Sequence, residues 1–570
     1  MLTGKTASKG RALGKVFKFE KKELHIKKET CEDPKQCLKA FKDALAKSSE
    51  ELRALRDRTL EKLDEDHADI FEAHIEMVND VEIRNQVIAM IEDKKSAQLA
   101  YKTVTDQFIE IFEGMEDEYF QARAADVKDI QHRVLSHLLG EPIKDMSMVD
   151  TDTIVFATDL TPSDTANFDF SHIKGFVTET GGMTSHTAIM ARAYNIPAIV
   201  GVKNALNQVE DDMLVYLDAT DNKIHLDPDD ATIEKAQTAI KADERHLEIL
   251  KEYQHIKTKT KDGVHIPLFA NIGSDRETDV LDENGAEGIG LFRTEFLFMD
   301  SDKMPSETEQ IESYKKVFSA IQPVIVRTLD IGGDKALPYL DQDKEDNPFL
   351  GKRAIRLCFE EIEMFKTQIR ALLKAATDQN DLRIMFPMVA TRDELIRAKN
   401  IVSEVMDALA EQNETYQKTV HFGIMIEIPA AALNAEQLGR EVDFFSIGTN
   451  DLIQYLFAAD RMNSAVSYLY EPFDPTLLRL IDTTIKAAKA TDTEIGVCGE
   501  MASNLDAALI LVGLDIDELS MNPSSILEIR RALSKIPMDA LKTFAEDVLK
   551  QPDAHAVKAC IKRFKESFDM

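Results

Sequence analysis

The sequence predicts a multidomain α/β protein in which a small α/β domain, interrupted by a helical bundle, precedes a (β/α)8 barrel. Three observations lead to this prediction. The chain has 570 residues, too many for a single hydrophobic core. The stretch 35–139 lacks proline, contains one glycine and repeats apolar residues at helical spacing. From about residue 258, short apolar segments alternate with helical patterns.

The small α/β domain is expected over residues 1–25 and 144–228. The strand-like segment GRALGKVFKF precedes the helical stretch, and five further segments follow it: DTIVFAT, GFVTE, PAIVG, MLVYLD and NKIHL. Because one strand comes before the helices and the others come after them, we interpret residues 26–143 as a helical bundle inserted into this domain.

One long charged helix with a narrow apolar stripe is expected over residues 229–257, as a linker. Residues 258–570 then have the size and rhythm of a (β/α)8 barrel. Eight short apolar segments are its expected strands: IPLFANI, GIGLFR, PVIVRTLD, RIMFPMV, GIMIEI, FFSIGTN, EIGVCG and DELSMN. A doubly wound sheet is the alternative architecture.

The chain is strongly acidic, with 69 lysine and arginine residues against 102 aspartate and glutamate residues and a formal net charge of -33. This charge disfavours nucleic acid and anionic membranes as partners, whereas a basic protein partner is compatible with it. No apolar run reaches the roughly 18 residues of a membrane span, and the N-terminus lacks the apolar core of a signal peptide. We therefore expect a cytoplasmic protein.

The five cysteines are few, scattered and odd in number: Cys31, Cys37, Cys358, Cys498 and Cys560. This pattern does not indicate a disulfide framework. Cys31 and Cys37 also lack the second Cys or His pair that a zinc site needs. We expect any functional cysteine to act as a free thiol.

Polar residues collect where the apolar segments of the barrel end. They are Arg293, Arg327, Asp330, Glu427, Asn450, Asp451, Cys498 and Glu500. Because barrel active sites lie at the carboxyl ends of the strands, we expect these side chains on one face. Arg293 and Arg327 on neighbouring strands suit a small dianion, since guanidinium groups bind phosphate or carboxylate at two points. For either arginine alone, a surface ion pair is the alternative.

Two carboxylates and one thiol give this face further chemistry. Glu427 and Asp451 follow consecutive strands, and two hard oxygen ligands suit a magnesium ion that retains waters and accepts substrate oxygens. Ordinary salt bridges are the alternative for both. Cys498 is placed to donate or accept a proton, and an inert buried cysteine is its alternative.

His186 differs from the other histidines because it lies in a tight turn, GGMTSHT, which leads into the apolar-periodic segment AIMARAYNI. It is therefore expected in the first turn of a helix, where free backbone N–H groups and the helix dipole favour an anionic adduct. An imidazole there can attack phosphorus and hold a phosphoryl group. A capping turn whose histidine only packs is the alternative.

An acidic segment of the helical stretch, DEDHADIFEAHIEMVNDVE, is a candidate docking face for a basic partner. Its acids, Glu65, Asp66, Asp69, Glu72, Asp80 and Glu82, surround an expected apolar centre at His74 and Met77. A solvated helix face is the alternative.

Several segments closely resemble the motifs of one known family, Enzyme I of the bacterial sugar phosphotransferase system. They are GGMTSHTAIMARAYNIPAIVG, GLFRTEFLFMD, RTLDIGGDK, NPFLGKRAIR, MIEIPAA, FFSIGTNDLIQYLFAADR and GVCGEMA. The likeness extends to the helical block, in IFEAHIEMVND and MEDEYFQARAADVKDI. The resemblance therefore covers the chain nearly from end to end. Members of this family are phosphoenolpyruvate-protein phosphotransferases.

The resemblance implies a swivelling phosphohistidine domain in which His186 is the phosphoacceptor and Thr165 a partner of its ring. The residues it implies for phosphoenolpyruvate binding are Arg293, Arg327, Lys335, Arg353, Asn450, Asp451 and Arg461. Glu427 and Asp451 are implied to ligate Mg²⁺, and Cys498 to protonate the enolate as pyruvate forms.

The resemblance further implies that the phosphoryl group passes from His186 to a histidine of the phosphocarrier protein HPr, the first step of sugar uptake. The inserted helices are implied to dock HPr, and the barrel to form a homodimer. Two departures from the family pattern concern the surroundings of His186. Met183 stands where arginine is frequent, and KTASKGRALG replaces the commoner ASPG.

Two rival functions fit the sequence less well. Pyruvate phosphate dikinase and phosphoenolpyruvate synthase share the histidine domain and the barrel, but they carry a large ATP-binding domain before the histidine. Here about 185 mostly helical residues precede His186, without a glycine-rich phosphate loop. A regulatory relative without activity is disfavoured because the histidine, the thiol and the carboxylates are all present.

Overall fold

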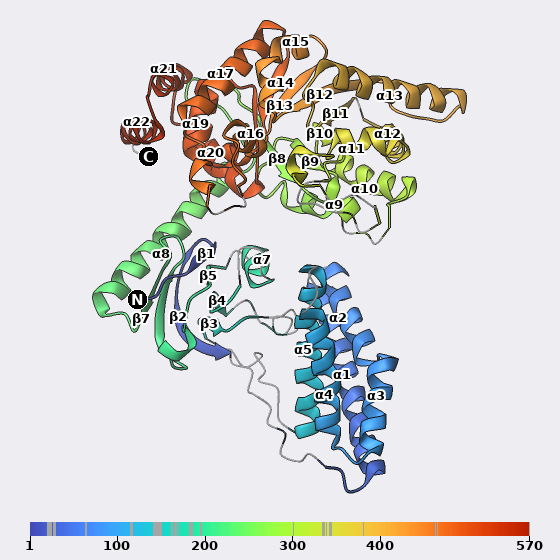
Figure 1. Cartoon of the computed structure of the whole chain (residues 1–570). Coiled ribbons are helices and arrows are strands. Elements are labelled where there is room, and N and C mark those ends of the chain that lie inside the picture. Colours follow the sequence, from blue (N-terminus) through green and yellow to red (C-terminus); the bar gives the residue numbers. More distant parts are fainter. Residues whose placement is uncertain are drawn as a thin grey trace. The chain divides into compact units, whose positions relative to one another are not determined.

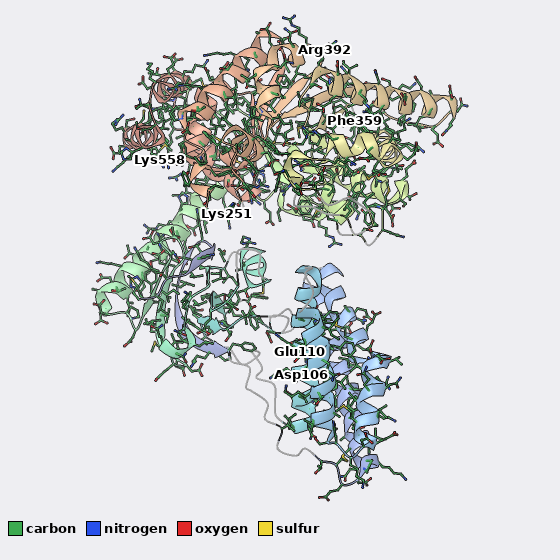
Figure 2. All side chains as sticks on the ribbon, in the orientation of Figure 1. Asp106, Glu110, Lys251, Phe359, Arg392 and Lys558 are labelled. Atoms are coloured by element: carbon green, nitrogen blue, oxygen red, sulfur yellow. A yellow bond between two sulfur atoms is a disulfide. The ribbon has the colours of Figure 1, made fainter. Side chains whose placement is uncertain are left out.

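The computed structural model describes residues 1–19, 26, 30–62, 65–113, 118–140, 151–160, 164, 168, 170, 172–181, 186–193, 196–299, 301, 303–332, 337, 339–340, 345–379, 381–461, 463, 465–568 and 570 (Figure 1). The chain divides into two compact units, Met1–His246 and Leu247–Met570. Figure 2 draws the side chains of the described residues. Within helices, only the backbone is described for residues 58–62, 65–70, 113, 118–123, 125, 186, 189 and 193.

A seven-stranded sheet forms the centre of the first unit, in the order β1-β5-β4-β3-β2-β6-β7. Its strands are β1 (Lys5–Ser8), β2 (Arg11–Phe19), β3 (Thr153–Ala157), β4 (Ile173–Thr178), β5 (Ala198–Val200), β6 (Leu214–Asp218) and β7 (Lys223–Leu226). Strand β2 pairs in parallel with β3 and antiparallel with β6. Since the helical segment lies between β2 and β3 in the chain, it is an insertion into the sheet domain, and this prediction is confirmed.

Strand β3 is buried on both faces of the sheet. Its side chains alternate, with Ile154 and Phe156 in one apolar cluster and Val155 and Ala157 in another. Helix α7 (His186–Ala193) contributes to the second cluster through its apolar residues. The short apolar strands and the helix that begins at His186 therefore follow the hydrophobic pattern of the sequence.

The inserted segment forms the helices α1 (Pro34–Lys62), α2 (Glu65–Val78), α3 (Val81–Glu92), α4 (Ala97–Glu113) and α5 (Glu118–Leu139). Their apolar faces meet in a core that includes Phe41, Leu52 and Val87. His74 belongs to the buried side of this bundle, because it has no exposed surface and its Nε2 lies 3.3 Å from Asp126 Oδ1. The expectation that His74 forms the centre of an exposed docking face is wrong.

The cysteines differ from the sequence-based expectation at one place. Cys31 and Cys37 form a disulfide, with their Cα atoms 6.5 Å apart. The first turn of α1 brings Cys37 back toward the segment before the helix, where the Cys31 N–H donates to the Lys94 carbonyl over 2.7 Å. The expectation that these two cysteines are free thiols is therefore wrong. Cys358, Cys498 and Cys560 are free and buried.

Helix α8 (Asp230–Lys251) follows the sheet in the chain and includes the residues at which the two units divide. Arg11 of β2 joins this helix to the sheet, because its Nη1 lies 3.0 Å from Asp243 and its Nε 3.2 Å from Asp218. Of the helices that the structure describes, none combines the length and the apolar character needed to cross a lipid bilayer.

The second unit is a closed barrel of eight parallel strands, in the order β10-β11-β12-β13-β14-β15-β8-β9. The strands are β8 (Leu268–Ile272), β9 (Ile289–Arg293), β10 (Val324–Arg327), β11 (Leu382–Phe386), β12 (Val420–Ile426), β13 (Phe444–Ile447), β14 (Glu494–Val497) and β15 (Glu518–Met521). Each overlaps one of the eight apolar segments predicted as strands, although β11 begins at Leu382 and β12 at Val420, before the segments predicted for them. The barrel prediction is confirmed, and the doubly wound alternative is wrong.

Helices surround the barrel (Figure 1). They are α9 (Glu295–Met299), α10 (Glu307–Ala320), α11 (Ile355–Glu360), α12 (Ile362–Ala375), α13 (Arg392–Glu411), α14 (Pro429–Leu433), α15 (Ala435–Gly439), α16 (Thr449–Leu456), α17 (Pro475–Ala490), α18 (Glu500–Ser503), α19 (Leu505–Gly513), α20 (Ile526–Leu533), α21 (Met538–Leu549) and α22 (Ala554–Glu566). The main apolar core lies between these helices and the strands, and a smaller cluster fills the barrel interior. That inner cluster comprises Leu291, Ile325, Met385, Met425, Phe444 and Cys498.

Candidate active site

The carboxyl ends of five barrel strands bring together polar residues that the sequence predicts. Strand β9 ends at Arg293 and β10 at Arg327, Glu427 follows β12, Asp451 lies in α16 after β13, and Cys498 follows β14. Because all eight strands are parallel in a closed barrel, these positions share one rim.

Arg327 is buried and held between two carboxylates. Its Nη1 lies 2.9 Å from Asp330 Oδ2, and its Nη2 pairs with Glu295. Burial alone lowers the pKa of Arg327, but the charges of Glu295, Asp330 and Glu427 raise it well above its usual value. The guanidinium group is therefore a permanent cation whose orientation is fixed before any ligand binds.

Arg353 is a second buried cation at the same rim. Its Nη2 lies 3.0 Å from Asp330 and 3.3 Å from Asp451, and its Nη1 donates to the Tyr455 hydroxyl over 3.3 Å. Burial lowers the pKa of Arg353, and the charges of Asp330 and Asp451 raise it above its usual range. Asp330 thus connects both buried arginines.

Glu427 is a buried carboxyl group with an unusual backbone donor. The Met388 N–H donates to its Oε1 over 2.6 Å. Met388 follows β11 with a φ of 56°, in the left-handed region that non-glycine residues seldom adopt. Burial, with the negative charges of Asp451 and Asp330, raises the pKa of Glu427 to about 8. The charges of Arg353 and Arg327 lower this pKa, so the two arginines offset part of the repulsion among the carboxylates, and a further cation would relieve the rest.

Asp451, Asn450 and Arg461 lie on and after α16. Asp451 Oδ2 is the oxygen that pairs with Arg353, whereas its buried Oδ1 has no hydrogen-bond partner among the described residues. Arg461 Nη1 lies 4.0 Å from that oxygen. Asn450 accepts a hydrogen bond from the Glu500 N–H over 3.0 Å, which joins α16 to the start of α18.

The Cys498 thiol is buried at the top of the inner apolar cluster. Its Sγ lies 3.7 Å from the Ile447 carbonyl oxygen. Burial raises the pKa of Cys498 to about 12; the Ser446 side chain and the Arg327 charge lower it, and Glu427 raises it. The thiol is therefore protonated at neutral pH and is suited to donate a proton rather than to attack as a thiolate.

Arg293 is half-buried beside the two buried arginines along the rim. Its guanidinium carbon lies 5.0 Å from the centre of the Phe296 ring. Its buried Nε has no hydrogen-bond partner among the described residues. Since β9 pairs with β10 at the level of Arg293 and Arg327, the two arginines are neighbours at the strand ends.

The remaining predicted site residues are described only in part. His186 begins helix α7, and of this residue the structure describes the backbone. Thr165, Lys335 and Met183 lie outside the described residues.

Sequence reasoning missed three side chains at the rim: Glu295, Tyr455 and Asn271. Glu295 is fully buried beside Arg327, and Tyr455 accepts from Arg353. Asn271 in β8 donates to the backbone carbonyls of Cys498 and Ser520. An acid two residues after the strand-end arginine, in FRTE, is the one local signal that points to any of them.

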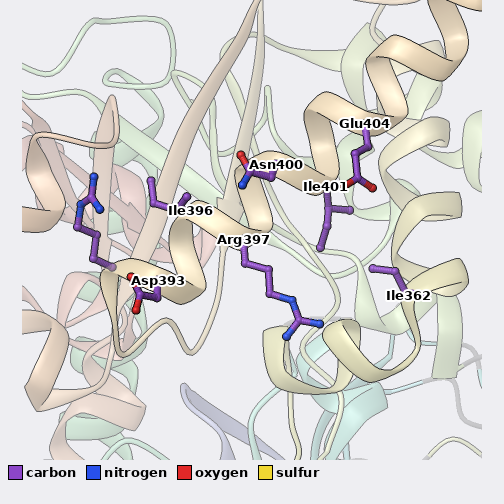
Figure 3. A pocket seen from close by; sticks show the side chains of 8 residues that line it. Ile362, Asp393, Ile396, Arg397, Asn400, Ile401 and Glu404 are labelled. Atoms are coloured by element: carbon purple, nitrogen blue, oxygen red, sulfur yellow. The ribbon is translucent and has the colours of Figure 1, made fainter.

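A cavity of about 470 Å³ lies away from this rim, on the outer layer of the barrel (Figure 3). Residues of α13, with Ile362 of α12, line it. The arginines there are engaged, because Arg392 Nε donates to Glu441 over 2.9 Å and Arg397 lies 4.1 Å from the Phe359 ring. The geometry therefore favours the rim as the anion site.

Three family descriptions match this chain. Residues 3–123 match "PEP-utilising enzyme, N-terminal", residues 149–222 match "PEP-utilising enzyme, mobile domain", and residues 248–538 match "PEP-utilising enzyme, PEP-binding domain". The barrel rim described above thus belongs to the part that matches a phosphoenolpyruvate-binding domain.

Curated relatives are similar to this chain over almost its whole length. The phosphoenolpyruvate-protein phosphotransferase of Bacillus subtilis (strain 168) is 44% identical, over 98% of this chain and 99% of the relative. The protein of the same name from Geobacillus stearothermophilus is 45% identical, over 98% of this chain and 97% of the relative. The one from Mycoplasma capricolum is 44% identical, over 100% of this chain and 99% of the relative.

Proposed function

Since the chain belongs to the phosphoenolpyruvate-protein phosphotransferase family, and so catalyses phosphoenolpyruvate-dependent phosphotransfer, we propose that it transfers the phosphoryl group onto its own His186 and releases pyruvate. HPr is the proposed acceptor of the second transfer, as the first step of sugar uptake. The observation that carries this proposal is the convergence of buried arginines, buried carboxylates and a protonated thiol at one rim of the barrel.

The charges at the rim suit a phosphorylated carboxylic acid bound with a cation. Arg327 and Arg353 are oriented by Asp330, and Arg293 retains an unpaired N–H donor. Arginines arranged in this way stabilise the negative charge that spreads over a phosphoryl group during transfer. Asn450, Arg461 and Lys335 complete the proposed substrate site with Asp451.

The proposed cofactor is Mg²⁺, ligated by Glu427 and Asp451. The fit rests on the unpartnered Oδ1 of Asp451 and on the raised pKa of Glu427, since a cation relieves the repulsion between the two carboxylates. Among the described residues, there is no group of three or more His, Cys, Asp or Glu side chains that could hold a metal ion. Substrate and water oxygens would therefore complete the coordination, and the bound ion would withdraw charge from the phosphoryl group.

The proposed reaction has two bond-changing steps. A nitrogen of the His186 imidazole forms a bond to phosphorus as the bond from phosphorus to the enol oxygen breaks. The enolate then takes the proton of the Cys498 thiol at its terminal carbon, which gives pyruvate and a thiolate. Solvent returns a proton to the thiolate, because the pKa of Cys498 is about 12.

Further parts of the proposal come from the family. The domains are proposed as residues 1–25 with 144–228, the insert 26–143 that docks HPr, the linker 229–257 and the barrel 258–570. Thr165 is the proposed partner of the His186 ring. A homodimer formed through the barrel and a cytoplasmic location complete the proposal.

Intact-mass spectrometry after incubation with phosphoenolpyruvate and Mg²⁺ tests the phosphorylation step. One phosphoryl group is expected on the wild-type chain and on the control His172→Ala, and none on His186→Ala. Pyruvate release should require HPr for multiple turnovers. Labelling that persists in His186→Ala would overturn the assignment of the phosphoacceptor.

A further inference from the structure

Asn271 lies inside the barrel and reaches across a neighbouring strand. Strand β8 pairs with β15, and β15 pairs with β14. The Asn271 Nδ2 donates to the Ser520 carbonyl of β15 over 3.3 Å and to the Cys498 carbonyl, beyond β14, over 2.9 Å. An amide on β8 can reach past β15 only through the barrel interior.

The orientation of the Asn271 amide follows from its three partners. Both carbonyl oxygens only accept hydrogen bonds, so the nitrogen must face them. The opposite side of the amide, Oδ1, accepts from the Ser520 hydroxyl over 2.6 Å. Every contact therefore agrees with one orientation, and Ser520 holds the amide in that orientation.

The backbone of Cys498 is fixed on both sides of the residue. Its N–H donates to the Ile447 carbonyl over 3.1 Å, and its carbonyl accepts from Asn271. The next residue, Gly499, packs against Thr449, because a Cβ at Gly499 would lie 2.7 Å from the Thr449 backbone nitrogen. These contacts position the backbone that carries the thiol, whose Sγ lies 3.7 Å from the Ile447 carbonyl oxygen. Among them, the Asn271 amide is a side-chain contact that mutation can remove.

We propose that Asn271 is a positioning residue for proton transfer: by holding the Cys498 carbonyl, it aims the thiol at one face of the enolate. This inference rests on the proposed function, in which the S–H bond of Cys498 breaks and a C–H bond forms at the enolate carbon. Ser520 supports Asn271 from the other side. Asn271 itself touches no reacting atom.

Two consequences distinguish this role from a merely structural one. Phosphoryl exchange between phosphoenolpyruvate and His186 needs no proton from Cys498, whereas pyruvate formation does. A misdirected thiol should therefore lower the ratio of pyruvate formation to exchange. A misdirected thiol should also lose facial selectivity, because water would protonate the enolate from either side.

The test uses the full chain with Mg²⁺ and HPr, and compares Asn271→Asp, Asn271→Ala and Ser520→Ala with wild type. The aspartate is nearly isosteric but lacks the Nδ2 donor. We expect the ratio of pyruvate formation to exchange to fall about tenfold or more in both Asn271 variants, and less in Ser520→Ala. Asn284→Ala is the matched control, since that amide donates to the Val280 carbonyl over 2.8 Å, outside the rim.

Facial selectivity is measured with (Z)-3-fluorophosphoenolpyruvate in deuterium oxide, from the configuration of the deuterated fluoropyruvate trapped by reduction. Wild type and Asn284→Ala should give mainly one enantiomer, and the Asn271 variants a mixture. An unchanged ratio with unchanged selectivity in Asn271→Asp would overturn the inference. Equal losses of exchange and pyruvate formation, with retained selectivity, would also overturn it, because they indicate a structural role.

Cys498→Ser separates failure of this inference from failure of the proposed function. If Cys498→Ser forms pyruvate as fast as wild type, Cys498 is not the acid and the proposed function fails with the inference. If Cys498→Ser is slow while both Asn271 variants behave as wild type, the inference alone fails.

Discussion

At the scale of single residues, the rim is ordered by its own charges before substrate binds. Asp330 lies 2.9 Å from Arg327 and 3.0 Å from Arg353, so one carboxylate orients two guanidinium groups. Both arginines are buried, where an unpaired charge would be costly. The arrangement supplies fixed dipoles and charges that need little reorganisation during phosphoryl transfer.

Replacing Cys498 by serine should separate the two chemical events. A hydroxyl is a far weaker acid than a thiol, so pyruvate formation should fall by roughly 10²–10⁴ while phosphoryl exchange continues. Pyruvate release and transfer of a labelled phosphoryl group from phosphoenolpyruvate to His186 are the two measurements, because the second involves no proton transfer to carbon. Cys560→Ser removes a free thiol of α22 and should behave as wild type. Undiminished pyruvate formation in Cys498→Ser would show that another group donates the proton.

Glu518 should make barrel stability depend on pH. Its Oε2 is buried without a hydrogen-bond partner among the described residues. Burial raises the pKa of Glu518 from 4.5 to about 8. The folded state therefore retains this proton longer than the unfolded state does, and the stabilising contribution present below pH 4.5 is lost as pH rises toward 8.

The thermal midpoint of the barrel is measured as a function of pH in wild type and in Glu518→Gln, whose side chain cannot ionise. The wild-type midpoint should fall relative to that of the variant between pH 4.5 and 8 and run parallel above that window. Other titrating groups are common to both proteins and cancel in the difference. Parallel midpoints over the whole range would show that Glu518 ionises normally.

At the scale of elements, the disulfide between Cys31 and Cys37 secures the start of α1. It closes a short loop, so an entropic contribution of about 2 kcal/mol is expected from constraint of the unfolded chain. Cys37→Ser, or reduction of the wild type, should lower the free energy of unfolding of the helical insert by up to that amount. Chemical denaturation followed by circular dichroism measures it.

Reduction provides the control for that prediction. Reducing agent should destabilise the wild-type insert and leave Cys37→Ser unaffected, and labelling of His186 by phosphoenolpyruvate should not change in either. Equal stability of oxidised and reduced wild-type protein would contradict the prediction.

Much of this element order was predictable from the hydrophobic pattern, and contacts between distant segments were not. The continuous apolar run of β3, which is buried along its whole length, and the eight apolar barrel segments are local signals. The disulfide depends on how the first turn of α1 approaches the preceding segment. The links from Glu295 to Arg327 and from Asn271 to Cys498 join residues far apart in the chain. A local pattern can mark one member of such a pair, as FRTE does for Glu295, but it does not identify the partner.

At the scale of the whole molecule, the net charge of -33 makes electrostatics a part of any encounter with a partner. The acidic side chains of α2 and α3 differ in whether they already have a partner within the protein. Glu72 already pairs with Arg56 over 2.6 Å, and Asp80 caps α3 by accepting from the Ile83 N–H. Glu76 and Glu82 are exposed, and the hydrogen-bond partner of Glu82 is the neutral Gln86 side chain, which donates to it over 2.9 Å, so both acids are candidates for steering a basic partner.

Neutralising Glu76 and Glu82 together, as Glu76→Gln and Glu82→Gln, should slow phosphoryl transfer to HPr and weaken its dependence on salt. Charges on a docking face raise the association rate through long-range attraction, which salt screens, so the deficit should be largest at low ionic strength. The rate of transfer from phosphorylated enzyme to HPr is measured at several salt concentrations.

The control has an equal change of charge on α8, where the exposed acids Glu244 and Glu248 are replaced together, as Glu244→Gln and Glu248→Gln. Labelling of His186 should be equal in all three proteins, because it does not involve HPr. Equal losses in both variants would mean that net charge alone steers HPr, and no loss in either would place the docking face elsewhere.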